Sequence, residues 1–251
     1  MDLRFDEKIV LVTGASGGIG AALVQAFAAA GATVAAHFNS RREEAERLVA
    51  EVAEAGGEAF AQQADLADPE AAERLVEAVV DRAGRIDVLV NNAGALMRRT
   101  PVEDADLDLC RRLLDVNYVS TFVACRAALP RLRAAGGGSI VNVGSVAART
   151  GGGGGAVLYA AAKAAVTTFT RGLALEVAGT GVRVNNLEPG LIDTTFHAEV
   201  TADDAFARLA EGTPIGHAGA PSDCAAAALY LAHPEAAAFV TGATLTVSGG
   251  V

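Results

Sequence analysis

Tyr159 and Lys163 lie four residues apart in the segment YAAAK, and this pair could carry out proton transfer. Reduction of a ketone leaves a developing alkoxide, which needs a proton donor and a hydrogen-bond donor at its oxygen. The spacing places both side chains on one helix face, where the ammonium of Lys163 could lower the pKa of Tyr159. The alternative is an ordinary helix face with a half-buried Tyr and a solvated Lys.

Ser145 and a run of glycines precede this pair in the chain. Ser145 comes just after the β-branched segment at 139–143, where its hydroxyl could polarise a substrate carbonyl. Residues 151–155 are all glycine and connect Ser145 to Tyr159, so we expect them to form a wall of the substrate pocket without side chains. A loop insertion that the fold merely tolerates is the alternative interpretation.

A second glycine-rich segment, TGASGGIG at 13–20, follows the first β-branched run. Gly14, Gly18 and Gly20 would let the backbone turn tightly and approach a ligand, and a helix is expected directly afterwards. The unpaired N–H groups of a helix N-terminus favour a pyrophosphate, so this position predicts a dinucleotide site. An ordinary glycine-rich turn is the alternative, because the spacing differs from G-x-G-x-x-G.

The end of the second β-branched run bears on which dinucleotide binds. A site for NAD usually carries Asp or Glu about 20 residues after the glycines. Residues 37–42 read HFNSRR and contain no acid. Ser40 and Arg41 suit a 2′-phosphate, which predicts NADP(H). NAD(H) stays possible, because Arg41 and Arg42 could equally begin an exposed helix.

Strand-like and helix-like segments alternate along the whole chain. The predicted helices include 41–55, 69–83, 106–134 and 158–178. The predicted strands are 8–12, 33–38, 87–91, 139–143, 182–187 and 244–247, with 58–63 as a weaker candidate. This alternation predicts an α/β fold, namely a single doubly wound Rossmann domain over residues 1–251 with about seven parallel strands and helices on both faces. Ligands would then bind beyond the carboxyl ends of the strands.

Composition limits the classes of partner. The 251 residues carry a net charge of −10, which argues against a nucleic-acid or anionic-membrane surface. No segment predicts a membrane span or a targeting signal. Cys110, Cys125 and Cys224 are far apart and predict free thiols in the reducing cytoplasm. The four histidines lack ligand spacing, so no metal site is expected at His37, His197, His217 or His233.

Further short motifs follow one another along the chain, and jointly they resemble the short-chain dehydrogenase/reductase family. These motifs are TGASGGIG at 13–20, ADL at 64–66, NNAG at 91–94, LLDVN at 113–117, VGS at 143–145, YAAAK at 159–163, VRVNNLEPG at 182–190 and SGG at 248–250. The resemblance covers essentially the whole chain. Within the family, the chain is most similar to 3-oxoacyl-acyl-carrier-protein reductases and glucose dehydrogenases.

The resemblance implies a role for each matching residue. Asn117, Ser145, Tyr159 and Lys163 would form the catalytic tetrad, with Asn117 kinking its helix and ordering a water that leads to Lys163. Tyr159 and Lys163 would also contact the cofactor. The other cofactor contacts that it implies are Thr13, Gly14, Ser16, Gly18, Ile19 and Gly20 at the pyrophosphate, Asp65 and Leu66 at the adenine, Asn91, Ala93 and Gly94 behind the adenosine ribose, and Pro189, Gly190, Ile192 and Thr194 around the nicotinamide.

The sequence departs from the family pattern at a few positions. Ser145 and Tyr159 are separated by one residue more than is commonest, and the extra residue falls in the glycine run. Glu188 stands where the family more often has a small or amide residue. Its carboxylate could bind a substrate hydroxyl or cation, or it could pair with a basic neighbour. Arg98, Arg99 and Arg149 are the only obvious basic residues near the pocket mouth for an acyl carrier protein.

The sequence therefore predicts an NADP(H)-preferring carbonyl reductase, with a 3-oxoacyl thioester as one candidate substrate. The alternatives are a sugar or other alcohol dehydrogenase that works oxidatively with NAD, and a non-catalytic protein that senses NADP(H). The family commonly pairs its long helices across a two-fold axis, so we expect a homotetramer. The variable segment 195–213 is expected to set substrate specificity.

Overall fold

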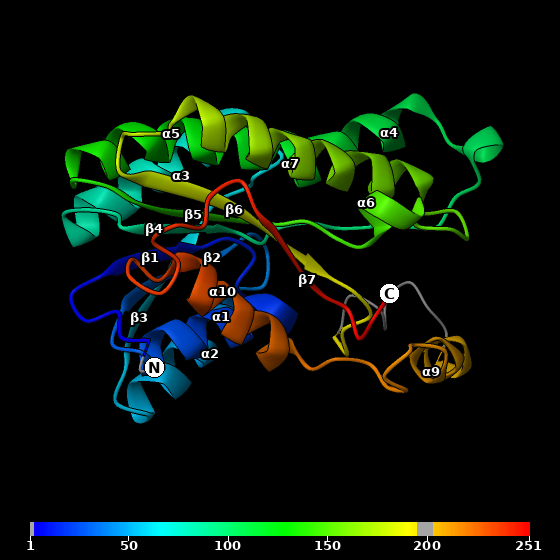
Figure 1. Cartoon of the computed structure of the whole chain (residues 1–251), viewed down its shortest axis with the longest axis horizontal. Helices are drawn as coiled ribbons and strands as arrows, with labels where there is room; N and C mark the ends of the chain where they lie inside the picture. Colours follow the sequence, from blue (N-terminus) through cyan, green and yellow to red (C-terminus); the bar gives the residue numbers. More distant parts are fainter. Residues whose placement is uncertain (1–2, 195–202) are drawn as a thin grey trace.

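Seven parallel strands form one sheet in the computed structural model of this chain, which describes residues 3–194 and 203–251 (Figure 1). The sheet order is β3-β2-β1-β4-β5-β6-β7. The strands are β1 (Ile9–Val12), β2 (Thr33–Phe38), β3 (Glu58–Gln63), β4 (Val88–Asn91), β5 (Gly138–Val143), β6 (Val182–Pro189) and β7 (Thr244–Val247). The weaker strand candidate at 58–63 is thus confirmed as β3.

Helices cover both faces of the sheet (Figure 1). One face carries α1 (Gly18–Ala29), α2 (Arg42–Glu54) and α10 (Pro221–Ala232). The opposite face carries α3 (Pro69–Ala83), α4 (Leu107–Leu114), α5 (Ser120–Ala134) and α7 (Val157–Glu176). Two further helices, α6 (Ala147–Thr150) and α9 (Asp203–Glu211), lie at one end of the molecule. The predicted doubly wound α/β fold is confirmed.

Each face of the sheet buries its own apolar cluster. On the α1 side, Leu23 and Phe27 pack with Leu231 of α10. On the other side, Leu75 of α3 and Leu132 of α5 pack over the central strands. Strands that are buried on both faces need apolar side chains in succession, and this requirement explains why the β-branched runs mark the strands in the sequence.

The strand order reverses between β1 and β4. β1 pairs with β2 on one side and with β4 on the other, so the connections that leave these two strands diverge. A crevice opens at such a switch point, beyond the carboxyl ends of the strands. The glycine-rich segment after β1 and the segment after β4 therefore border the expected ligand site.

The predicted helix at 106–134 is interrupted. Between α4 and α5 the chain forms a π-helical turn, η2 (Asp115–Val119), with Asn117 at its centre. Such turns occur mostly as single widened turns inside α-helices and often mark functional sites. The kink expected at Asn117 therefore takes the form of a widened turn.

Among the helices of the described residues, none has the combined length and apolar character required to cross a bilayer.

Candidate active site

A cavity of about 710 Å³ opens at the carboxyl ends of the strands. Fifteen of the predicted site residues line it, namely Gly14, Ser16, Gly18, Ile19, Gly20, Arg41, Ala93, Gly94, Ser145, Tyr159, Lys163, Pro189, Gly190, Ile192 and Thr194. A smaller cavity of about 180 Å³ shares Gly14, Ser16, Arg41, Ala93 and Gly94 with it, and adds Ser40, Asp65 and Leu66. Three predicted residues, Thr13, Asn91 and Asn117, line neither cavity.

The glycine-rich segment is packed too tightly for side chains. A Cβ on Gly14 would lie 2.8 Å from the Cα of Ala93, and one on Gly20 would overlap the carbonyl oxygen of Gly14. Gly14 and Gly18 have φ values of 65° and 54°, in the left-handed region that favours glycine. The helix α1 begins at Gly18, so its N-terminal N–H groups face the cavity lined by this segment.

Thr13 holds two strand ends together and does not face the cavity. Its Oγ1 accepts hydrogen bonds from the backbone N–H groups of Asn92 and Ala93, each at 3.0 Å. The Asn92 side chain donates in return to the carbonyl oxygens of Thr13 and Gly14, at 2.9 and 3.0 Å. The segments after β1 and β4 are thereby fixed to each other. These bonds give Thr13 a positioning role, and its contact with a pyrophosphate stays a prediction.

His37 positions the glycine-rich segment from the end of β2. Its Nδ1 accepts the backbone N–H of Gly14 at 3.0 Å, and its Nε2 lies 3.1 Å from the carbonyl oxygen of Ala64. Burial lowers the pKa of His37 to about 4, so the ring is neutral at pH 7 with its proton on Nε2. In the sequence, His37 was a candidate only for metal binding. Its position just before Ser40 and Arg41, which are predicted to bind the 2′-phosphate, was the signal that it belongs to the same site.

The two arginines after β2 differ in what surrounds them. Arg42 lies over the Phe38 ring, 5.3 Å from its centroid, and pairs with Glu46 one turn later at 3.2 Å. Arg41 lines both cavities, next to Ser40 in the smaller one. No Asp or Glu occurs at 37–42, and Asp65, the acid that lines the smaller cavity, accepts a hydrogen bond from Asn39 at 3.3 Å.

Asn91 lies in the interior of the sheet and lines neither cavity. Its Nδ2 donates to Asn142 Oδ1 at 2.9 Å and lies 3.3 Å from Cys125 Sγ. Successive side chains of a strand point to opposite faces, so Asn91 turns inward at the last residue of β4. Asn92, Ala93 and Gly94, which follow it, line the cavity.

Asn117 is buried beneath the segment that follows β4. Its Oδ1 accepts the N–H of Ala95 at 3.1 Å, and its Nδ2 donates to the carbonyl oxygens of Ala95 and Leu113 at 2.8 and 2.9 Å. The π-helical turn leaves the Leu113 carbonyl available to this side chain. A Cβ on Gly94 would lie 2.7 Å from Asn117 Oδ1 and 2.9 Å from Lys163 Nζ, so glycine lets both groups approach this strand end.

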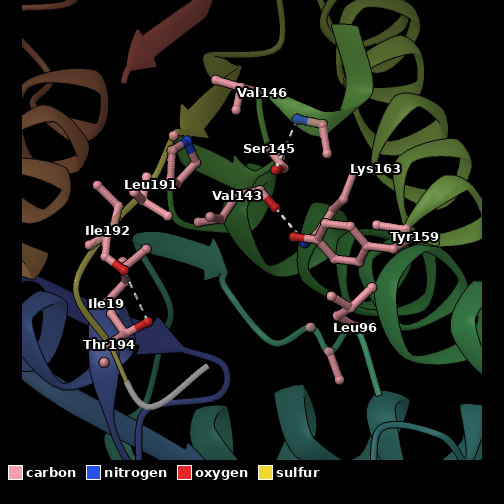
Figure 2. Close-up of a pocket in the computed structure, with 18 of the residues that line it drawn as sticks. Ile19, Leu96, Val143, Ser145, Val146, Tyr159, Lys163, Leu191, Ile192 and Thr194 are labelled. Carbon is pink, nitrogen blue, oxygen red and sulfur yellow. Dashed lines mark hydrogen bonds between the residues drawn. The ribbon is translucent and has the colours of Figure 1, made fainter. Parts of the chain in front are cut away.

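Ser145, Tyr159 and Lys163 meet at the cavity wall (Figure 2). Lys163 donates from Nζ to the carbonyl oxygen of Val143 at 2.8 Å, and this nitrogen lies 5.9 Å from the centroid of the Tyr159 ring. The Ser145 Oγ accepts the N–H of Ala147 at 3.2 Å, which fixes the hydroxyl at the start of α6. Ser145 and Tyr159 are also hydrogen-bonded to each other.

Burial shifts the pKa values of both titratable groups in this set. It lowers the pKa of Lys163 to about 8, because a buried ammonium loses its hydration. It raises the pKa of Tyr159 to about 12, and the hydrogen bond with Ser145 opposes that rise. In the chain without a cofactor, the Lys163 ammonium is directed to Val143, and the lowering of the Tyr159 pKa stays a prediction for the enzyme with its cofactor bound.

The glycine run packs against the segment that follows β4. All five glycines at 151–155 have φ between 49° and 79°. Gly155 accepts the N–H of Thr100 at 2.9 Å, and a Cβ on it would lie 2.7 Å from that nitrogen. Arg99 donates to the Gly154 carbonyl at 3.3 Å. Only Gly152 of the run lines the cavity, so the expected side-chain-free wall is much smaller than the run.

Glu188 pairs with a basic neighbour and does not face the cavity. Its side chain is 1% exposed, and Oε2 accepts from Arg149 Nε at 3.2 Å. Its Oε1 accepts from Thr167 Oγ1 at 3.1 Å and lies 3.3 Å from Asn186 Nδ2. The structure thus favours the second of the two interpretations that the sequence left open.

Other candidate groups are dispersed. The three cysteines are free thiols. Within the described part of the chain, His, Cys, Asp and Glu side chains form no group of three that could hold a metal ion. His197 and residues 195–202 of the predicted specificity segment lie outside the described residues.

Comparison with known proteins identifies the family. The family model described as short chain dehydrogenase matches residues 8–205. The chain belongs to the short-chain dehydrogenase family. It is therefore an oxidoreductase that acts on hydroxyl or carbonyl groups, as the motif order implied.

Relatives of this short-chain dehydrogenase include both dehydrogenases and reductases. It is 41% identical to 3beta-hydroxysteroid dehydrogenase 1 of Eggerthella lenta over 97% of this chain and 93% of that protein. It is 37% identical to a 3-oxoacyl-[acyl-carrier-protein] reductase of Synechocystis over 97% of this chain and 96% of that protein. The resemblance to 3-oxoacyl reductases is thereby confirmed as a family relationship.

Solved structures agree with the fold. A 7 alpha-hydroxysteroid dehydrogenase complexed with NADH and 7-oxo glycochenodeoxycholic acid superposes with a TM-score of 0.93 at 34% identity, covering 99% of this chain and 96% of that one. A short chain dehydrogenase from Burkholderia cenocepacia in complex with NADP has a TM-score of 0.91 at 38% identity, with 98% of both chains covered. Its structural neighbours thus bind either NAD(H) or NADP(H).

Proposed function

We propose that this short-chain dehydrogenase interconverts a ketone and a secondary alcohol and prefers NADP(H). The observation that carries the proposal is the convergence of Ser145, Tyr159 and Lys163 on one cavity whose other end is lined by Arg41 and the glycine-rich segment. Proton-transfer groups and a phosphate cradle within one cavity are what a nicotinamide-dependent reaction requires.

The residues present fit a nicotinamide dinucleotide. Gly14 and Gly20 approach other backbone so closely that a Cβ on either would be obstructed, and the N-terminus of α1 supplies N–H donors for a pyrophosphate. Pro189, Gly190, Ile192 and Thr194 would hold the nicotinamide end, and Asp65 and Leu66 the adenine end. When bound, the cofactor supplies the hydride for reduction or accepts it for oxidation.

The side chains of the chain itself would handle the substrate oxygen. Ser145, held by the Ala147 N–H, would donate a hydrogen bond to the carbonyl oxygen and stabilise its developing negative charge. Tyr159 would donate the proton to that oxygen during reduction and accept it during oxidation. Lys163 would hold positive charge behind the Tyr159 ring. Asn117 would fix the segment after β4 through its two hydrogen bonds with Ala95, while its third bond, to Leu113, ties the side chain to α4.

The preference for NADP(H) follows from Ser40 and Arg41. Both line the smaller cavity, where an adenosine 2′-phosphate would bind. A guanidinium and a hydroxyl favour a phosphate, whereas the carboxylate usual in NAD sites would repel it. A dehydrogenase that acts oxidatively with NAD is the second candidate, because NADH is bound in one structural neighbour. A non-catalytic sensor is less well supported, since it would not need Ser145, Tyr159 and Lys163 in one cavity.

We further propose a homotetramer in the cytoplasm. Phe122 of α5 is 39% exposed and Leu175 of α7 is 81% exposed, so the two long helices present apolar surface that a partner subunit could cover. The three free cysteines support a reducing compartment.

Measurement of nucleotide affinities tests the cofactor assignment. We expect wild type to bind NADPH at least about 10-fold more tightly than NADH, the factor for one lost charged hydrogen bond. Arg41→Ala should remove most of that preference. Arg42→Ala is the matched control, because Arg42 is engaged by Phe38 and Glu46, and it should leave the preference unchanged. Equal affinities in wild type, or the same loss in both variants, would contradict the assignment.

A further inference from the structure

His37 lies where the segments that follow three neighbouring strands meet. It is 2% exposed, stands near the end of β2 and lines the smaller cavity. Its ring contacts Gly14 after β1 at 3.0 Å and Ala64 after β3 at 3.1 Å. Its own carbonyl oxygen accepts the N–H of Ala15 at 2.8 Å. One residue therefore joins the ends of β1, β2 and β3 on the side of the sheet where a ligand binds.

The two contacts of the ring require a single protonation state. Nδ1 must be unprotonated to accept the N–H of Gly14, and Nε2 must carry the proton to donate to the Ala64 carbonyl. Burial favours this neutral ring and lowers the pKa of His37 to about 4, although the Ala64 carbonyl and the charge of Asp65 both oppose the change. A histidine that stays neutral near pH 7 does not act as an acid or a base there, so its ring is a fixed connection between two backbone segments.

Both segments that the ring joins line the smaller cavity. Gly14 and Ser16 line it from the glycine-rich segment, which leads into the N-terminus of α1. Asp65 and Leu66 line it from the segment that begins at Ala64. The first segment would bind the pyrophosphate and the second the adenine. The ring therefore fixes the spacing between the contacts for two parts of one ligand.

We propose that His37 is a positioning residue for the cofactor, whose ring holds the pyrophosphate and adenine contacts at the spacing that a dinucleotide needs and so strengthens the binding of NAD(H) and NADP(H) alike. This inference rests on the proposed function. His37 does not line the larger cavity, where Ser145, Tyr159 and Lys163 meet, so it should act on cofactor binding and not on the reaction. Its role also differs from that of Arg41, which would discriminate between the two cofactors.

Calorimetric binding of NADP⁺ and NAD⁺ to variants of His37 tests the inference. His37→Leu makes neither side-chain contact, so both dissociation constants should rise together by about 10-fold, the factor for an N–H group left without its acceptor. His37→Asn offers an acceptor near the place of Nδ1, and His37→Gln a donor near that of Nε2, so each should recover part of the affinity. With saturating cofactor, kcat on a ketone should stay within about 3-fold of wild type, because only binding is weakened.

His233 provides the matched control. It is 8% exposed, its Nδ1 accepts the backbone N–H groups of Glu235 and Ala236 at 3.2 and 3.1 Å, and it lines neither cavity. His233→Leu should lower the free energy of unfolding and leave both dissociation constants unchanged. Equal weakening of binding in His37→Leu and His233→Leu would reduce His37 to a general contribution to the fold and overturn the inference. Unchanged binding in His37→Leu, or a loss for NADP⁺ alone, would overturn it as well.

Nitrogen NMR of histidine-labelled wild type tests the connection itself, even if His37→Leu fails to fold. At neutral pH the His37 ring should be uncharged with its proton on Nε2. A charged ring, or a proton on Nδ1, would exclude the bond from Gly14 and overturn the inference while leaving the proposed function intact. The proposed function fails separately: wild type that binds neither dinucleotide would contradict it, and the inference would fall with it.

Discussion

The ion pair between Glu188 and Arg149 should stabilise the fold asymmetrically, because the two partners differ in burial. The Glu188 side chain is 1% exposed and the Arg149 side chain is 51% exposed. Arg149→Met leaves a buried carboxylate with only the neutral donors of Thr167 and Asn186. Removal of one partner of a buried pair lowers the free energy of unfolding by about 3–5 kcal/mol. Because Arg149 is half-exposed, we expect a loss at the lower end, about 3 kcal/mol.

Glu188→Gln should cost less, since it removes the charge together with the need to neutralise it. Gln keeps a carbonyl acceptor for Thr167, so the loss is the difference between a charged and a neutral hydrogen bond, about 1 kcal/mol. In the double variant, Arg149→Met no longer leaves a buried carboxylate without its charged partner. The combined loss should therefore fall below the sum of the single losses by about 1–2 kcal/mol.

Urea unfolding at neutral pH measures all four free energies of unfolding. Neither residue lines the cavity, so NADPH affinity and the relative rates across a substrate panel should stay close to wild type in Glu188→Gln. A larger loss for Glu188→Gln than for Arg149→Met, or strict additivity, would refute the ion-pair reasoning. A changed substrate profile with unchanged stability would instead return Glu188 to the substrate site.

Three further predictions concern stability and assembly. Gly155→Ala should lower the free energy of unfolding by at least about 1 kcal/mol more than Gly153→Ala. Both glycines have positive φ, but only at Gly155 would the added Cβ clash with the backbone of Thr100. Equal losses in the two variants would argue against tight packing of the glycine run. Burial lowers the pKa of Lys163 to about 8 in the folded protein, so between about pH 8 and 10.5 the unfolded chain binds more protons than the folded one. Burial of the ammonium therefore destabilises the folded protein below pH 8, and this loss of stability disappears as the pH rises. As the pH is raised from 8 to 9.5, the free energy of unfolding of wild type should therefore rise by about 2 kcal/mol relative to that of Lys163→Met. If the difference between the two proteins does not change with pH, Lys163 is not desolvated. Light scattering should give the mass of a tetramer at micromolar concentration, and a monomer would contradict the proposed assembly.

The fold could be predicted from the sequence because its strands are buried on both faces and its helices carry regular apolar faces. Even 58–63, which lacks a strong β-branched run, becomes β3 through its pairing with β2. Most predicted ends of helices and strands differ from the observed ends by a residue or two, as expected where helices fray. The expectation that residues 1–251 form one domain stays a prediction.

The site was less predictable where a side chain's partner lies far away in the sequence. Asn91 belongs to the NNAG motif, yet strand alternation turns it toward Asn142, 51 residues away. Glu188 meets Arg149 across 39 residues, and His37 meets Gly14 across 23. Spacing along the chain contains no information on such contacts. Tyr159 and Lys163 were predictable because one helical turn fixes their relation.

The pKa of Tyr159 in the chain without cofactor could not be predicted from the spacing, for a related reason. The helix spacing indicates that Lys163 is near, but not that its Nζ donates to Val143. Desolvation then dominates and raises the pKa of Tyr159 to about 12. The proximity of two titratable groups does not determine their coupling, because a third group can hold the charge.

The central claim is that Tyr159 exchanges the proton at the substrate oxygen, and Tyr159→Phe tests it most directly. The variant keeps the ring but loses the hydroxyl, so it should fold and still bind NADPH. Turnover of the best ketone in the panel, followed by the absorbance of the reduced nicotinamide, should fall by about 10²–10⁴-fold, the range for loss of a general acid. Tyr159→Phe that binds NADPH normally and retains more than about a tenth of wild-type kcat would contradict the mechanism.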